Sequence, residues 1–256
     1  MNDPMPFLYH AAFLNEKGAA LMKAGKQHEA FETFIVAVET IDKLSQDIKA
    51  QRYLPHRAFL ALPSSRRRKQ SLQTSPCLDC IISCDDTFEK LGFHSGSLGS
   101  DHVTFVYNQA FRFAPRDLAH FHGCEETMMH YVKLYRAILT FNSALTFHQR
   151  GIGAMESVKS TAESVASNLY LDAVNLLQEC FSTLDSCRVL SATLNNAAML
   201  YYEAQDLAKF ECFQTELHRL LVDMESSYPK SVDPRCLRCL FFNATLLSVP
   251  RTASAA

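Results

Sequence analysis

The sequence predicts a mostly α-helical protein built from antiparallel helical hairpins. Small and large residues recur at helical spacing in two stretches of the chain. The first stretch contains Phe13, Leu14, Gly18, Leu21, Gly25, Ala30, Phe34 and Ala37, and the second contains Ala198, Tyr201, Leu207, Phe210 and Leu217. A small residue on one helix lets its neighbour approach, and large residues fill the seam around it. The chain also has only 8 Gly and 9 Pro in 256 residues, which favours helices over a turn-rich β fold.

Residues 1–50 predict one complete helical hairpin. Asp3 followed by Pro4 is a helix-start signal, and Gly25 is the residue at which we expect this first helix to end. A second helix is then expected to continue to about Ile48, because apolar residues recur along it at helical spacing.

Residues 51–100 interrupt the helical pattern and are interpreted as an insertion. Within them, the basic run Arg66–Lys69 is surrounded by Ser, Gln and Pro. A run of like charges beside such residues buries too little apolar surface to become ordered. We therefore expect residues 60–76 to be disordered.

Residues 101–123 are expected to form a strand and a loop. From Val103 to Phe113 large apolar residues alternate with polar ones, which is typical of a half-buried strand. A single strand needs a partner for its backbone. The apolar segment 78–83 is the candidate, which would give a small β-hairpin beside the helices.

Residues 124–249 predict further helical repeats and a C-terminal capping helix. Gly, Pro and Asp-Pro signals divide this region into expected helices at Glu125–Arg150, Met155–Leu184, Ser186–Ala204, Leu207–Tyr228 and Asp233–Ser248. Residues 250–256 are expected to form a flexible tail.

Three segments align with one another on the small residue of their first helix. The aligned positions are Gly18, Ala144 and Ala198, then Leu21, Phe147 and Tyr201, and at the turn Gly25, Gly151 and Gln205. This pattern resembles the tetratricopeptide (TPR) repeat, a helix–turn–helix unit of about 34 residues. The middle repeat departs from the pattern, because Glu156 stands where the family has Ala. The resemblance implies hairpins stacked as a right-handed superhelix in a divergent member of the family.

The resemblance also implies a concave groove that binds a peptide or an amphipathic helix of another protein. The candidate contact residues are Asn15, Met22, Lys23, His148, Gln149, Asn195, Met199, Tyr202 and Glu203. Met and Tyr suit an apolar partner, although residues at this spacing more often belong to a buried core. A further alternative is that the chain's own C-terminal helix, expected from Asp233, occupies the groove.

TPR proteins that bind chaperone C-termini use a clamp of Lys, Asn and Arg for the terminal carboxylate. The corresponding positions here are Asn15, Ala19, Asn142, Ala192 and Asn196. They supply no cation to meet a carboxylate, so the sequence argues against a receptor for such tails.

Other function classes find little support in the sequence. The net charge of -2 argues against a nucleic-acid partner. The sequence contains no run of about 18 apolar residues, so we expect no membrane span. There is no nucleophile elbow, phosphate-binding Gly loop or zinc-protease motif, so we expect no enzyme activity and no cofactor.

The cysteines indicate a compartment and leave one alternative open. Their number, 9, is odd and favours a reducing compartment, cytoplasmic or nuclear. Cys77, Cys80 and Cys84 form a dense cluster, so the alternative function is a metal- or redox-responsive protein. The chief expectation remains a non-enzymatic adaptor, with self-association through its apolar faces as a further possibility.

Overall fold

The computed structural model describes residues 5–53, 109–113, 125–152, 154–180 and 183–228, together with residues 240, 241 and 244. Within these residues the protein is mostly helical and contains no strand. The helices are α1 (Met5–Lys23), α2 (Gln27–Tyr53), α3 (Glu125–Gly151), α4 (Glu156–Gln178), α5 (Leu184–Glu203) and α6 (Leu207–Ser227). Among the described residues, no helix is long and apolar enough to cross a membrane.

Several expectations fall largely outside the described residues. These are the disordered stretch 60–76, the hairpin partner 78–83, the tail 250–256 and most of the C-terminal helix, of which Leu240, Phe241 and Ala244 are helical. Of the expected strand Val103–Phe113, only residues 109–113 are described; they form no strand, although Phe113 makes an isolated β-bridge.

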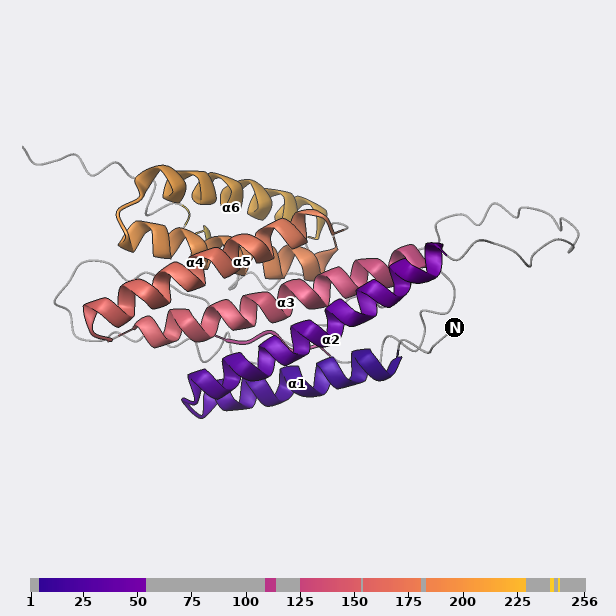
Figure 1. Ribbon diagram of the computed structural model, residues 1–256. Helices are drawn as coiled ribbons and strands as arrows, with labels where there is room; N and C mark the ends of the chain where they lie inside the picture. The colour runs from indigo at the N-terminus through magenta and orange to yellow at the C-terminus, as the bar shows by residue number, and fades with distance from the viewer. Residues whose placement is uncertain are drawn as a thin grey trace, which may run out of the picture.

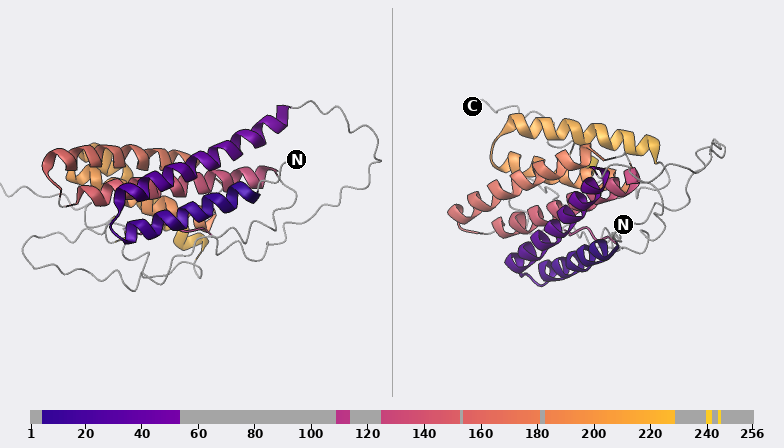
Figure 2. Two further views of the ribbon diagram at one scale, coloured as in Figure 1. Left: turned by 60° about the horizontal axis from the view of Figure 1, so that its bottom comes forward. Right: turned by 45° about the vertical axis from the view of Figure 1, so that its right-hand side comes forward.

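Each helix packs against the next one along the chain (Figures 1 and 2). In addition, α1 contacts α3 and α3 contacts α5, whereas the described parts of α2, α4 and α6 make no contacts with one another. The odd-numbered helices therefore lie together on one side of the helix array. We call this side the odd-helix face.

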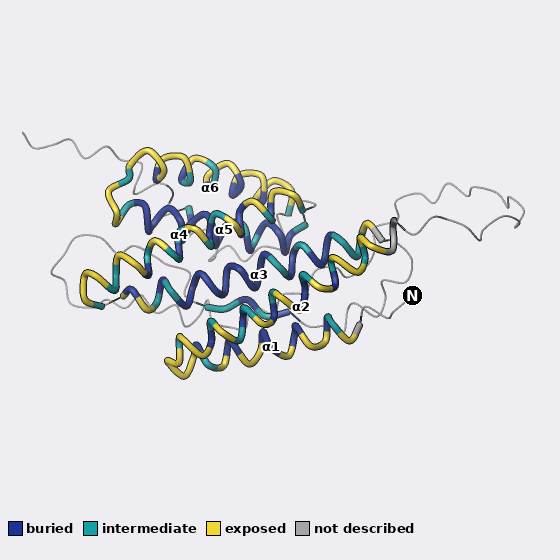
Figure 3. The backbone as a smooth tube through the Cα atoms, viewed as in Figure 1, coloured by how far each residue is buried: buried dark blue, intermediate teal, exposed yellow. Residues whose placement is uncertain are grey.

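Helix α3 lies at the centre of this arrangement. It packs against α1, α2, α4 and α5 and is buried along most of its length, whereas α1 and α6 each keep an exposed side (Figure 3). An ion pair between Arg136 Nε and Asp42 Oδ1, 2.7 Å apart, links α3 to α2 near the surface. The buried residues of α3 include, besides large apolar ones, the polar residues Thr140, Asn142, Ser143 and Thr146.

Two hairpins, α1–α2 and α5–α6, have the same turn. Gly25 and Gln205 occupy the same place in them, with φ values of 75° and 58° in the left-handed region. The N–H groups of Gly25 and Lys26, like those of Gln205 and Asp206, donate to carbonyls of the preceding helix at 2.9–3.0 Å. This is the Schellman helix end, which favours Gly because a side chain strains the backbone there. The aligned turn positions predicted from the sequence are confirmed for these two hairpins.

We expect substitutions at these two turn positions to have opposite effects on stability. Gln205→Gly should raise the free energy of unfolding by about 0.5–1 kcal/mol, and Gly25→Ala should lower it by about 1–2 kcal/mol. A Cβ on Gly25 would meet nothing within 4 Å, so this effect comes from the backbone alone. Urea denaturation of both variants measures the difference, and changes of the same sign would contradict the shared turn.

The first hairpin depends on the small residue predicted for it. A Cβ added to Gly18 would lie 2.7 Å from Cζ of Phe34, whose side chain is fully buried. Glycine at this position therefore lets α1 and α2 approach closely enough for Phe34 to fill the seam between them.

Two predicted helix boundaries are wrong. Helix α2 continues beyond Ile48 to Tyr53, because the first proline that could stop it is Pro55. The helix predicted to run to Leu184 ends instead at Gln178, and α5 begins at Leu184.

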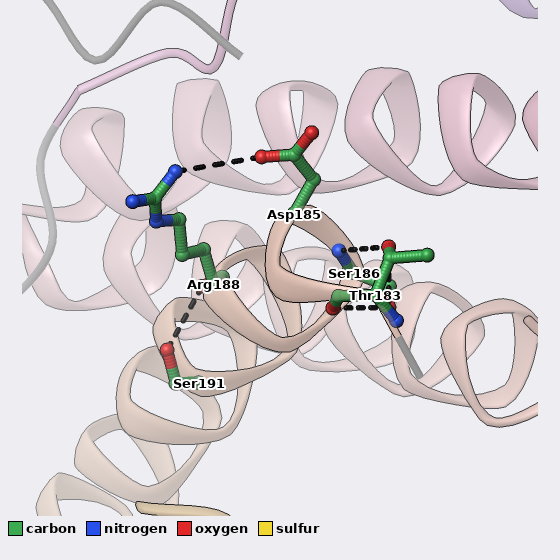
Figure 4. A network of polar contacts seen from close by, with 5 residues as sticks. All are labelled: Thr183, Asp185, Ser186, Arg188 and Ser191. Atoms are coloured by element: carbon green, nitrogen blue, oxygen red, sulfur yellow. Dashed lines mark hydrogen bonds and ion pairs between the residues drawn. The ribbon is translucent and has the colours of Figure 1, made fainter. Parts of the chain in front are cut away.

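A capping box at the start of α5 explains the second of these differences (Figure 4). Thr183 Oγ1 accepts a hydrogen bond from the N–H of Ser186 at 3.2 Å, and Ser186 Oγ accepts one from the N–H of Thr183 at 2.9 Å. The buried carboxylate of Asp185 lies in the first turn, 3.5 Å from Arg188 Nη1, where the helix dipole also favours negative charge.

Candidate functional site

A short non-helical segment, Gln109–Phe113, lies against the odd-helix face. It passes along α3 on the side of α1 (Figure 1). The side chains of Phe111 and Phe113 are each only 2% exposed. This part of the odd-helix face is therefore covered by the chain itself.

Two buried asparagines hold the backbone of Phe111. Asn142 Oδ1 accepts a hydrogen bond from the N–H of Phe111 at 2.9 Å, and Asn142 Nδ2 donates to the Phe111 carbonyl at 2.8 Å. Asn15 Nδ2 donates to the same carbonyl at 3.0 Å, and Asn15 Oδ1 accepts from Asn142 Nδ2 at 2.8 Å. We call Asn15 and Asn142 the asparagine clamp.

The clamp binds the peptide group and not a side chain. One asparagine side chain offers both a donor and an acceptor, so Asn142 can hold the N–H and the carbonyl of one residue at once. Both asparagines are 0% exposed, so water does not compete for these hydrogen bonds. The hydrogen bonds of the clamp therefore do not themselves select a side chain, and any selection comes from the groups that surround it.

Aromatic side chains fix the two phenylalanines of the segment. The ring of Phe111 lies 5.1 Å from the ring of Phe141, and the ring of Phe113 stacks on Tyr135 with centroids 4.2 Å apart and planes 10° apart. Because Phe111 bonds Asn142 and Phe113 contacts Tyr135, the segment runs antiparallel to α3. Large aromatic surfaces of this kind dominate the burial energy of an interface.

The residue between the two phenylalanines faces the surface. Arg112 Nη1 lies 3.6 Å from Glu16 Oε2, with the two side chains 30% and 48% exposed. The segment thus alternates, with Phe111 and Phe113 buried and Arg112 at the rim, as an extended chain must.

A second buried polar cluster joins α3, α4 and α5. Asn195 Nδ2 donates to Asn196 Oδ1 at 3.3 Å, and Asn196 Nδ2 donates to Tyr170 Oη at 3.1 Å. Tyr170 Oη in turn lies 3.2 Å from His148 Nδ1. All four side chains are at most 4% exposed.

Burial controls the protonation of this second cluster. Desolvation lowers the pKa of His148 to about 4 and raises the pKa of Tyr170 well above its usual range. Tyr170 Oη accepts from Asn196, which leaves its hydroxyl hydrogen available to His148 Nδ1, and the lowered pKa keeps the imidazole neutral. The cluster is a fixed structural network that connects three helices.

The predicted contact residues divide into a buried and an accessible group. Asn15, Met22, His148, Asn195 and Met199 are buried. Gln149 and Tyr202 are half-buried, and Lys23 and Glu203 are exposed. The accessible residues all lie near the C-terminal ends of α1, α3 and α5, and Gln149 accepts a hydrogen bond there from Gln27 at 2.9 Å.

The structure brings Asn15, Asn142 and Phe111 into contact, which the sequence did not predict. Asn15 and Asn142 were both placed on the groove side, but their shared contact with Phe111 was not foreseen. The available signal was the alternation of Phe111 and Phe113 with polar residues, which we interpreted as a strand.

No group of three or more His, Cys, Asp and Glu side chains in the described part of the chain could hold a metal ion. The cluster of Cys77, Cys80 and Cys84 lies outside that part. Among the described cysteines, burial raises the pKa of the Cys180 thiol to about 11, which disfavours the reactive thiolate.

Comparisons with known protein families, with curated proteins and with solved structures give no match to this chain. The function proposed for it therefore depends on the geometry of the odd-helix face.

Proposed function

We propose that this chain is a non-enzymatic, TPR-like interaction module that binds a segment of another protein on its odd-helix face. The shared turns of the α1–α2 and α5–α6 hairpins and the contacts among α1, α3 and α5 support stacked repeats of this kind. In a superhelix of such repeats the first helices line the concave side, which corresponds to the odd-helix face.

The observation that carries the proposal is the asparagine clamp. Asn15 and Asn142 hold both the N–H and the carbonyl of Phe111, so this face binds an extended peptide backbone within the molecule itself. Main-chain hydrogen bonds supply affinity in such recognition, and pockets for alternate side chains supply specificity. This geometry favours an extended peptide over an amphipathic helix as the partner.

Accessible residues beyond the clamp give the partner further contacts. Lys23 and Glu203 are exposed at the C-terminal ends of α1 and α5, whereas the half-buried ring of Tyr202 lies against α6, 5.3 Å from that of Phe210. A cation and an anion at the rim would select the orientation and charge of a bound segment more than its affinity.

Site-specific photo-crosslinking tests the proposal. A photoreactive residue is placed at Lys23 or at Glu203, and matched controls carry it at Glu39 of α2 or Glu211 of α6, which are exposed on even-numbered helices. We expect the first two positions to crosslink, in cells, to the same segment of one partner protein, identified by mass spectrometry. Equal crosslinking from the control positions, or none from Lys23 and Glu203, would contradict the proposal.

A further inference from the structure

We propose that the asparagine clamp, together with Phe141, Tyr135 and Glu16 beside it, recognises extended segments with an aromatic–basic–aromatic sequence. Phe111–Phe113 is the internal occupant of this site, and a matching segment of a partner protein displaces it. This inference deepens the proposed function and rests on it. It names the chemistry of the partner and the regulation of its binding by the chain itself.

The two buried positions define the aromatic requirement. Phe111 is enclosed beside Phe141, and Phe113 stacks on Tyr135 at 4.2 Å. Because alternate residues of an extended chain point to the same side, a ligand must present its anchors two positions apart. The clamp holds the backbone of the first anchor, Phe111, and therefore fixes the register.

The position between the anchors defines the charge requirement. Arg112 lies at the rim, 3.6 Å from Glu16, so a basic residue is favoured there over an acidic one. Exposed ion pairs of this kind contribute modestly, and the charge selects among ligands whose aromatic anchors already fit.

The helices that form the clamp are connected without the segment. Helices α1 and α3 contact each other, and both pack on α2. The ion pair between Arg136 and Asp42 and the hydrogen bond from Gln27 to Gln149 also link α3 to α2. Displacing Phe111–Phe113 therefore removes the occupant while the contacts between these helices remain.

A tethered occupant lowers the apparent affinity for a free ligand. An internal segment competes at an effective concentration in the millimolar range, and a ligand binds only the fraction of molecules whose clamp is open. We therefore expect the wild-type protein to bind a free segment at least about tenfold more weakly than a variant whose segment no longer fits.

Fluorescence anisotropy with a labelled synthetic peptide of residues 107–115 tests this expectation. The double variant Phe111→Ala/Phe113→Ala should bind the peptide at least about tenfold more tightly than the wild-type protein. Adding Asn142→Ala to the double variant should abolish binding. A control peptide in which both phenylalanines are alanine should not bind any of these proteins.

A charge reversal tests the basic position separately. The variant Glu16→Lys, made in the double variant, should bind the peptide with the central Arg more weakly and a peptide with a central Glu more tightly. Each dissociation constant should change by about two- to fivefold. An unchanged preference would overturn the assignment of Glu16 as the residue that selects the central charge.

Hydrogen exchange of the wild-type protein tests whether the peptide displaces Phe111–Phe113, even if the double variant does not fold. Excess peptide should speed exchange of the Phe111 amide, which the clamp otherwise protects, and leave the amides of central α3 unchanged. If the Phe111 amide exchanges only with global unfolding and ignores the peptide, the segment is permanent core and the inference fails. Crosslinks from Lys23 and Glu203 would then still support the proposed function.

Discussion

We expect Asn142→Ala to lower the free energy of unfolding by about 2–4 kcal/mol. The substitution removes three hydrogen bonds at once: one from the N–H of Phe111, one to its carbonyl and one to Asn15 Oδ1. Each buried polar group that loses its partner costs about 1–3 kcal/mol, because no water replaces the lost bond. Asn142 is 0% exposed, so water has no direct route to the position.

Urea denaturation monitored by circular dichroism measures this loss, with Thr215→Ala as the matched control. Thr215 also donates a side-chain hydrogen bond, to the carbonyl of Glu211 at 2.8 Å, but it is exposed on α6. Water replaces that bond, so the control should change stability by no more than about 0.5 kcal/mol. Equal effects of the two substitutions would show that the asparagine clamp is not closed in solution.

The hairpins could be predicted because their signals are local. Gly25 ends α1 through its own backbone freedom, and the alignment with Gly25 placed Gln205 at the corresponding turn although glutamine gives no turn signal itself. The boundary at Thr183 was missed, since its capping box uses Ser186 in place of the usual Glu or Gln. Local signals thus identify most of the helices and turns where the residue type is the common one, and at Gln205 the alignment with Gly25 supplied the signal that the residue itself lacks.

The contact that forms the candidate site could not be predicted in the same way. Asn15 and Phe111 are 96 residues apart, and no local pattern states that one donates to the other. The periodicity of α1 and α5 also cannot distinguish a groove from a core, because both require the same spacing. Met22 and Met199 illustrate this, since the sequence placed them at a groove and the structure buries them.

The buried polar cluster leads to a second large effect, on the pH dependence of stability. Burial lowers the pKa of His148 to about 4 in the folded protein, whereas an unfolded chain has the ordinary value of 6.5. The unfolded state therefore binds a proton first as the pH falls, and the contribution of neutral His148 is complete above about pH 6.5. We expect unfolding free energy to decrease by about 3 kcal/mol between pH 6.5 and pH 4 through this residue alone.

The variant His148→Gln separates that contribution from those of other titrating groups. One of these is His130, whose pKa is also lowered, first by desolvation and then by the charge of Lys133. Glutamine keeps an acceptor for the hydroxyl of Tyr170 but cannot take up a proton. Urea denaturation from pH 7 to pH 4 should give a shallower decline for the variant, with the difference growing below pH 6.5. Parallel curves would mean that His148 titrates normally in the folded protein, and hence that the network linking α3, α4 and α5 opens to water in solution.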